Sequence, residues 1–412
     1  MIYIPIILSL TLLIIDLVKN KKILAPGVVF NAVTFITLFL YSFQLSYIQH
    51  TLLWQTVLLL TLCIVAFNVP VFLGYFVKRE PKSDKAVVYR DYDTSKKADL
   101  ILFIIIVVIF SIEVIYNCGV PLLWKLLGTK KTYMDFSFFK LHGIFMSLLL
   151  TVGFYSLFKK NCPYKWIYLL IPILLISRQY LISILIEGLV LYLLSMKRRP
   201  KHLWLWLVGF VVVGIVAFGV IGNFRTGKAE FLYVAQFKAW ADWVPSALKW
   251  VYSYICFSIA NLNKLVGLTN GFENFGASTL TGILGIPIPE NASYDYLVSP
   301  NFTVSTFMPS LYLDFGMLGP ILFCLVIGMV SIWVYKRLSV SKIYLMFYAI
   351  IVHNLIFLYF TNMFLYRPIF LQVIYILIIF VLPQTIQRRK NERNNLGGGK
   401  RHQTVSVDGG DQ

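Results

Sequence analysis

Long apolar stretches recur along the chain from its first residues to about residue 383, and short polar segments separate most of them. A helix that crosses a bilayer needs roughly 20 predominantly apolar residues, and shorter helices suffice where anchoring residues flank them. The pattern therefore predicts eleven transmembrane helices. They are expected at 2–18, 28–48, 52–77, 99–116, 141–158, 164–177, 181–196, 203–221, 310–335, 343–360 and 368–383.

Composition supports a membrane protein. Of the 412 residues, 58% are hydrophobic and only 13% are charged, with a mean hydropathy of +0.76. One soluble core could not bury this much apolar surface. We expect an all-α polytopic protein in which 1–221 and 310–387 hold the membrane helices, 222–309 forms one large external loop, and 388–412 is a basic cytoplasmic tail, disordered from about Gly397.

The basic residues sort to one side of the predicted membrane. If 19–22 is cytoplasmic, the same side also receives 78–98, 159–165, 197–202, 336–342 and the tail from 388, and these segments hold 26 of the 37 Lys and Arg residues. Cytoplasmic loops are enriched in Lys and Arg, so the N-terminus is expected outside and the C-terminus inside. The net charge of +19 is thus explained by topology and needs no nucleic-acid partner.

One pair of apolar stretches leaves two arrangements open. The stretches at 164–177 and 181–196 are short and meet at Ser177, Arg178, Gln179 and Tyr180. They form either two helices that meet near the outer face or one interrupted helix, which would reverse the topology of everything after it. Basic residues at 159–160 and 197–199 flank both outer ends and favour two helices.

The long segment 222–309 opens with GNFRTGKAEF and continues into a stretch dense in aromatic residues. Trp and Tyr residues concentrate where a protein meets lipid headgroups. We therefore expect an interfacial helix in this segment, within a compact domain that rests partly on the bilayer. The aromatic residues are Trp240, Trp243, Trp250, Tyr252 and Tyr254.

Sequence motifs for cofactors are absent. The chain has no GxxxxGK[ST], no GxGxxG after a predicted strand and no HExxH, and its five cysteines form no CxxC pair. We therefore expect no nucleotide, no metal site and no other cofactor. Two Asn-x-Ser/Thr triplets, which begin at Asn291 and Asn301, are the kind that arises often by chance.

Three arginines lie at the predicted outer ends of membrane helices: Arg178, Arg225 and Arg367. An arginine in the hydrocarbon region costs on the order of 3 kcal/mol, and the outer face is depleted in basic residues. An anionic ligand would explain them, because guanidinium forms two parallel hydrogen bonds to a phosphate or carboxylate. The alternative for each is a side chain that reaches the interface or an internal salt bridge.

A few acidic and imidazole groups are candidates for proton transfer or for support. Asp314 begins an apolar stretch in SLYLDFGMLGP, where it is either a functional acid at membrane depth or a stabilising acid at a helix start. Glu113 and Glu187 are expected to neutralise an arginine within the bundle. His353, followed by Asn354, is interpreted as an interhelical hydrogen-bonding pair or as a proton carrier.

The chain resembles the Wzy-type oligosaccharide repeat-unit polymerases of bacterial O-antigen, capsule and exopolysaccharide synthesis. The resemblance is most specific in PNFTVSTFMPSLYLDFGMLGP (300–320), where Tyr312, Asp314, Phe315, Gly316 and Gly319 match the family pattern. Asn301 and Thr303 match it less well, since Val304 stands where the family usually has Thr. The Ser177-Arg178-Gln179 segment and FRTG at 224–227 are also similar to the family.

The resemblance implies a GT-C-like membrane fold and glycosyl transfer at the outer face of the bacterial inner membrane. The growing glycan passes from undecaprenyl pyrophosphate to a new lipid-linked repeat unit. No cofactor is implied because the pyrophosphate already activates the donor, and a flippase and a chain-length regulator are the expected partners besides membrane lipids. The implied catalytic residues are Arg178, Arg225 and Asp314, the last as base or structural support, and the implied substrate-binding residues are Arg367, Tyr312, Tyr180 and Asn301.

Three other functions remain open. An O-antigen ligase-like transferase would be expected to carry a histidine in the large external loop, and 222–309 contains none. A flippase or another transporter usually shows internal repeats and charged groups at mid-membrane, whereas the sequence has no obvious repeated halves. A membrane scaffold without catalysis would tolerate replacement of the external arginines.

Overall fold

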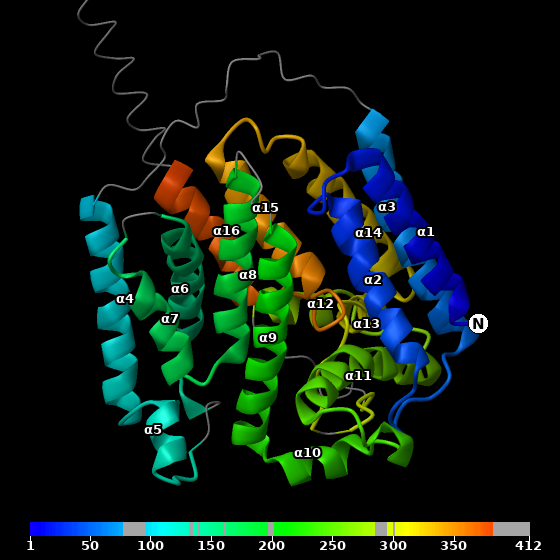
Figure 1. Ribbon diagram of the computed structural model, residues 1–412, viewed down its shortest axis with the longest axis horizontal. Coiled ribbons are helices and arrows are strands. Elements are labelled where there is room, and N and C mark those ends of the chain that lie inside the picture. The colour runs from blue at the N-terminus through cyan, green and yellow to red at the C-terminus, as the bar shows by residue number, and fades with distance from the viewer. Residues whose placement is uncertain are drawn as a thin grey trace, which may run out of the picture.

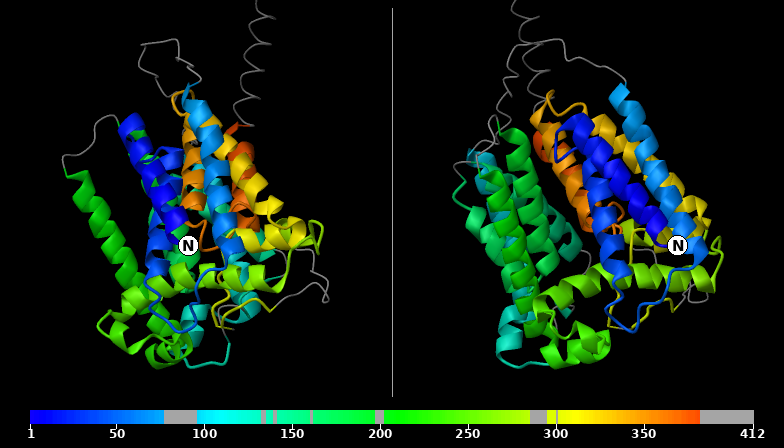
Figure 2. Two further views of the ribbon diagram at one scale, coloured as in Figure 1. Left: turned by 90° about the vertical axis from the view of Figure 1, so that its right-hand side faces the viewer. Right: turned by 45° about the vertical axis from the view of Figure 1, so that its right-hand side comes forward.

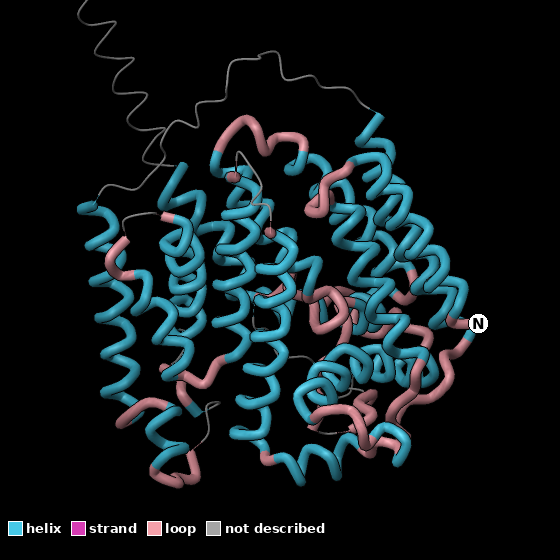
Figure 3. The backbone as a smooth tube through the Cα atoms, in the orientation of Figure 1, coloured by secondary structure: helices cyan, strands magenta, loops and turns pink. Residues whose placement is uncertain are grey.

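The computed structural model describes residues 1–76, 96–131, 135–138, 141–159, 162–196, 202–284, 295–299 and 301–381. Apart from one isolated bridge between Ser46 and Phe237, the regular structure in these ranges is helical (Figures 1 and 3). The helices are α1 (Tyr3–Asn20), α2 (Pro26–Ser42), α3 (Trp54–Phe76), α4 (Lys96–Asn117), α5 (Pro121–Leu126), α6 (Leu141–Phe158), α7 (Lys165–Leu174), α8 (Arg178–Ser195), α9 (Leu203–Thr226), α10 (Lys228–Ala235), α11 (Ser246–Leu268), α12 (Ala277–Leu284), α13 (Met308–Phe315), α14 (Leu318–Tyr335), α15 (Lys342–Ile356) and α16 (Arg367–Ile376).

In the described part of the chain, six helices are long and apolar enough to cross a membrane, which indicates a membrane-embedded protein. A seventh is added if the broken pair Val211–Phe224 and Lys228–Ala235, bent by 99°, is one span. Shorter apolar helices occupy the other predicted stretches, so a helix occurs in every one of the eleven ranges. The number of membrane crossings stays a prediction. The six are α1, α3, α4 taken together with α5 (Lys96–Leu126), α6, α8 and α14.

The predicted span 310–335 is two helices. The backbone at Gly316 has φ +55, a left-handed conformation that ends α13, and the Gly316 N–H donates to the carbonyl of Tyr312 at 2.8 Å. After this turn α14 begins and comes so close to α13 that a Cβ at Gly319 would lie 2.2 Å from the carbonyl oxygen of Leu311. Only α14 therefore has the length of a span.

The two short stretches around Arg178 form a helical hairpin. The chain turns at Ile176, whose φ is +51, and the Ser177 N–H donates to the carbonyl of Pro172 at 2.9 Å. Helix α8 then returns alongside α7, and both helices pack on α6. Of the two predicted arrangements, the structure therefore has the one with two separate helices.

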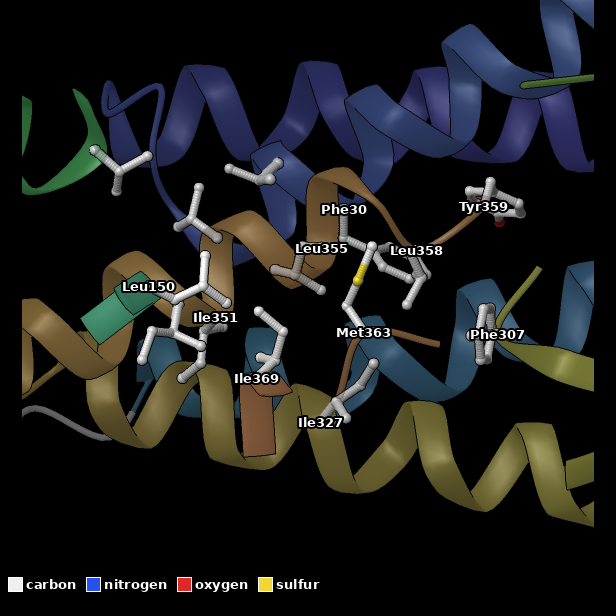
Figure 4. Packing of buried hydrophobic residues seen from close by; sticks show 14 of the residues in the cluster. Phe30, Leu150, Phe307, Ile327, Ile351, Leu355, Leu358, Tyr359, Met363 and Ile369 are labelled. Atoms are coloured by element: carbon white, nitrogen blue, oxygen red, sulfur yellow. The ribbon is translucent and has the colours of Figure 1, made fainter. Parts of the chain in front are cut away.

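The helices form two packed groups that α15 connects. Helices α1, α2, α3 and α14 pack together, α4, α6, α7, α8 and α16 form the second group, and α15 contacts members of both. Figure 4 shows the core between them, where Leu150, Ile351 and Ile369 from three helices lie side by side. The α1–α2 and α14–α15 connections lie at one end of the bundle, and α11 lies at the other (Figure 1).

The segment predicted as a large external loop is mostly helical and holds α10, α11 and α12. Helix α11 runs crosswise to the bundle (Figures 1 and 2), as an interfacial helix would. Trp240 and Trp243 are exposed, whereas Trp250 and Tyr252 are buried against other parts of the protein. Two of the predicted interfacial aromatics thus pack in the protein core.

Close packing between α3 and α14 depends on small residues. A Cβ at Gly328 of α14 would lie 2.5 Å from the carbonyl oxygen of Phe67 and 2.9 Å from the ring of Pro70, both on α3. Small residues allow helices in membranes to approach closely. Van der Waals contact between the helices then stabilises their association, because lipid provides no hydrophobic driving force for it. Gly328 therefore sets the distance between these two helices.

We expect Gly328→Val to destabilise the protein by about 1–3 kcal/mol, because the added methyl groups push α14 away from α3. The measurement is the thermal unfolding midpoint of detergent-purified protein. Gly214→Val in α9 is the matched control, since a Cβ at Gly214 meets no atom within 4 Å. Equal midpoints for the two variants would contradict the packing argument.

Candidate functional site

The guanidinium of Arg178 is buried at the first turn of α8. It donates hydrogen bonds to the carbonyl of Phe218 at 3.3 Å and to the hydroxyl of Tyr254 at 3.4 Å. Its central carbon also lies 4.5 Å from the ring centroid of Phe218, 5.6 Å from that of Tyr254 and 5.7 Å from that of Trp250. Helices α9 and α11 thus hold this cation by aromatic faces and two oxygens.

An apolar pocket of about 190 Å³ opens beside Arg178. Residues of the α7–α8 turn and of α9 form most of its wall, which is almost entirely apolar. Arg178 lines it mainly through carbon atoms, because its guanidinium donates to Phe218 and Tyr254. The pocket thus suits an apolar part of a ligand and lies next to a buried cation. The lining residues are Leu122, Pro172, Ile173, Ile176, Ser177, Arg178, Leu181, Val220, Ile221 and Phe224.

A pair of tyrosines links the starts of α8 and α16. The hydroxyls of Tyr180 and Tyr366 are hydrogen-bonded at 2.7 Å. Burial raises the pKa of Tyr366, which the hydrogen bond with Tyr180 partly opposes, so this phenol stays neutral. Arg178 and Arg367 are the first residues of these helices. The structure therefore brings the starts of two arginine-bearing helices together.

Helix starts reinforce the preference for an anion at this end of the bundle. The first N–H groups of a helix point outward and carry a partial positive charge. Two such starts, each with an arginine as its first residue, add fixed dipoles to the guanidinium charges. The end of the bundle near α11 is therefore electropositive beside an apolar pocket.

Helix α12 connects Asp314 with Arg367. The carboxylate of Asp314 is buried and accepts hydrogen bonds from the backbone N–H groups of Ser278 at 3.0 Å and Thr279 at 2.7 Å, at the start of α12. At the other end of α12, Arg367 donates to the carbonyl of Leu284 at 3.3 Å. The Asp314 carboxylate thus lies at the positive start of this helix, and the Arg367 guanidinium lies at its negative end.

Tyr312 and Asn301 differ in their surroundings. The Tyr312 hydroxyl is directed inward and donates to the carbonyl of Thr269 at 3.0 Å, so it holds the segment before α12. Asn301 is exposed. Arg225 lies in the last turn of α9, one residue after the pocket residue Phe224, and its side chain is outside the described part of the structure.

Glu113 and Glu187 were predicted to neutralise an arginine, and among the described residues this prediction is wrong. Glu113 of α4 lies 3.0 Å from Nδ1 of His142, the second residue of α6. Glu187 of α8 accepts a hydrogen bond from the side chain of Gln372 and lies 3.5 Å from Nδ1 of His353. Each carboxylate packs between helices that bring imidazole or amide groups to it, so neither needs an arginine.

The Glu113–His142 pair was not identified from the sequence as a site. Its carboxylate is fully buried, whereas 26% of the imidazole side chain is exposed. Next along α6, Gly143 lies against Arg367, since a Cβ there would be 3.8 Å from Cδ of the arginine. The sequence showed only that a titratable residue, Glu113 or His142, lies near each end of the external connection predicted between 116 and 141.

We expect Asp314→Asn to loosen α12, because the amide offers one oxygen to the two N–H groups and places a donor against the other. The cost is about 1–2 kcal/mol. Amide hydrogen exchange over 277–284 should speed up in the variant. Asp295→Asn, at an exposed position, is the control and should leave this exchange unchanged; unchanged protection in Asp314→Asn would show that the carboxylate does not cap α12.

Comparison of the chain with protein-family models, with curated proteins and with solved structures finds no match.

Proposed function

We propose that this chain polymerises undecaprenyl-pyrophosphate-linked oligosaccharide repeat units at the outer face of the bacterial inner membrane. In this proposal the eleven predicted helices cross the membrane, with the N-terminus outside and the C-terminus in the cytoplasm. The α1–α2 and α14–α15 connections, which Lys19, Lys21 and Lys336 flank, lie at the end opposite α11 and so support this orientation.

The observation that carries the proposal is the apolar pocket with Arg178 in its wall. A polyprenyl pyrophosphate combines a long apolar tail with a compact, highly charged headgroup. The pocket offers apolar side chains to the tail. In our proposal the guanidinium beside the pocket attracts the pyrophosphate by its positive charge. Because the aromatic rings and Phe218 carbonyl hold Arg178 in place, its charge is positioned before the ligand arrives.

Glycosyl transfer requires stabilisation of the leaving group. Negative charge develops on the pyrophosphate oxygen as the bond to the anomeric carbon breaks, and fixed positive groups lower the energy of that state. Arg178, Arg367 and the two helix starts supply such groups in our proposal. Arg225 follows the pocket residue Phe224 on α9 and is assigned to the same headgroup.

The remaining predicted site residues receive supporting or sugar-binding roles. Of the two roles considered for Asp314, structural support fits better, since both carboxylate oxygens already accept hydrogen bonds from α12. Tyr312 supports the same region through Thr269. Tyr180 and the exposed Asn301 are assigned to the glycan. Membrane lipids, a flippase and a chain-length regulator remain the expected partners, and no cofactor is required.

One observation favours a second candidate function, transport of a lipid-linked oligosaccharide. Glu187 and His353 lie 3.5 Å apart, and both are fully buried in the bundle. Ionisable residues inside a membrane bundle often mark transport pathways or proton relays. The polymerase proposal makes no use of this pair.

Deletion of the gene should leave a single repeat unit on the lipid carrier or core, and complementation should restore a ladder of glycan lengths. Gel electrophoresis of surface glycan is the measurement. Complete loss of surface glycan, with lipid-linked repeats trapped on the cytoplasmic side, would instead support transport. Normal chain length after deletion would rule out both functions.

Arg178→Lys should reduce long-chain glycan by about 100-fold, because an ammonium lacks the two-pronged donor geometry that stabilises the leaving pyrophosphate. Arg225→Ala should also abolish long glycan, with both proteins present in the membrane at normal amounts. Arg337→Lys is the matched control, since Arg337 also stacks on an aromatic ring, that of Trp333 at 4.1 Å, near the opposite end of the bundle. A full glycan ladder from Arg178→Lys would contradict the assignment of this residue.

A further inference from the structure

The Glu113–His142 pair combines a buried carboxylate with a partly exposed imidazole. Glu113 is fully buried in α4, and its Oε2 lies 3.0 Å from Nδ1 of His142 on α6. When the carboxylate is ionised and the imidazole is neutral, Nδ1 donates to Glu113 and Nε2 keeps its lone pair. The pair therefore fixes one tautomer of the imidazole.

Packing also fixes the orientation of the imidazole ring. The ring of Phe136 meets it edge to face, with centroids 5.9 Å apart, and Phe145 lies 6.3 Å away on the same helix. With Nδ1 held by Glu113 and the ring held by aromatic neighbours, the exposed part of His142 has a defined direction. A carboxylate, an imidazole and an outward lone pair in this order make up a general base.

The pair also lies next to a cation that we assign to the leaving group. The Arg367 side chain passes over Gly143, the residue after His142, at the start of α6. Gly143 and Arg367 belong to the first turns of α6 and α16, so the starts of both helices lie at the same end of the bundle. A substrate whose pyrophosphate contacts Arg367 would bring its reacting sugar near His142.

We propose that His142 is the catalytic base that activates the acceptor sugar, and that Glu113 positions it; this rests on the proposed polymerase function. Nε2 of His142 takes the proton of an acceptor hydroxyl while that oxygen forms a bond to the anomeric carbon of the donor glycan. The bond between this carbon and the pyrophosphate oxygen breaks, and its electron pair leaves with undecaprenyl pyrophosphate. The imidazolium, stabilised by Glu113, then returns its proton to solvent.

Asp314, the base considered from the sequence, is poorly suited to this step. Both of its oxygens are occupied by backbone N–H groups of α12, and the carboxylate is fully buried. His142 is partly exposed, and its contact with Glu113 uses Nδ1 and leaves Nε2 out. The difference in access to a substrate hydroxyl favours the imidazole.

The test uses the full-length protein in deletion cells. His142→Gln should lower long-chain glycan by about 100-fold or more, while membrane abundance and binding of undecaprenyl pyrophosphate, measured by native mass spectrometry, stay at wild-type levels. Glu113→Gln should cause a smaller decrease, since it disturbs only the tautomer and orientation. His50→Gln, at an exposed histidine of the α2–α3 connection, is the matched control and should give a full ladder.

Chemical rescue separates a catalytic base from a structural pair. In membrane vesicles loaded with lipid-linked repeats, added imidazole should restore several-fold activity to His142→Ala, because the small base fits the space left by the side chain. A full ladder from His142→Gln overturns the role of His142 but leaves the polymerase function intact. Loss of pyrophosphate-lipid binding in His142→Gln, or failure of rescue, shows that the pair only joins α4 to α6. If the wild-type gene restores no ladder, the polymerase function itself fails.

Discussion

The burial of the Arg178 guanidinium is the interaction on which the arrangement of the arginine-bearing end depends. Removing this cation from water is costly, and the cost is offset by the Phe218 carbonyl, the Tyr254 hydroxyl and three aromatic rings. These groups belong to α9 and α11, so both helices must pack against the α7–α8 turn before the charge is satisfied. Through α11, the segment predicted as an external loop is thereby packed against α9 and the buried arginine.

A second constraint acts through the short helix α12. Its N–H groups are satisfied by the Asp314 carboxylate and its last carbonyl by Arg367, although these residues lie on α13 and α16. Because a helix of eight residues has little stability alone, both contacts are needed to hold it. Asp314 thus influences the position of Arg367 through α12. The proposed site would therefore need this buried carboxylate even though it contacts no ligand.

Sequence periodicity predicted which segments are helical, and composition predicted the membrane. Three features could not be predicted in this way. The helix break occurs at Gly316, where a Cβ would meet the ring of Phe272 from another segment. The aromatic partners of Arg178 come from as far as 76 residues along the chain, and Glu113 and His142 are separated by 29. Contacts between helices decide these features, and apolar patterning along one helix carries no information on them.

Two carboxylate–imidazole contacts in the described ranges differ in their exposure to solvent. Glu113–His142 and Glu187–His353 contain the same groups at 3.0 and 3.5 Å, but 26% of His142 is exposed whereas His353 is fully buried. A base must reach a substrate hydroxyl, and an imidazole enclosed by α8, α15 and α16 has no such access in this conformation. The inner pair instead lies between helices, where Gln372 of α16 donates to Glu187 of α8 and His353 of α15 lies 3.5 Å from the same carboxylate. These contacts hold α15 to the second helix group. Exposure near Arg367 thus makes the outer pair the better candidate for the proposed base.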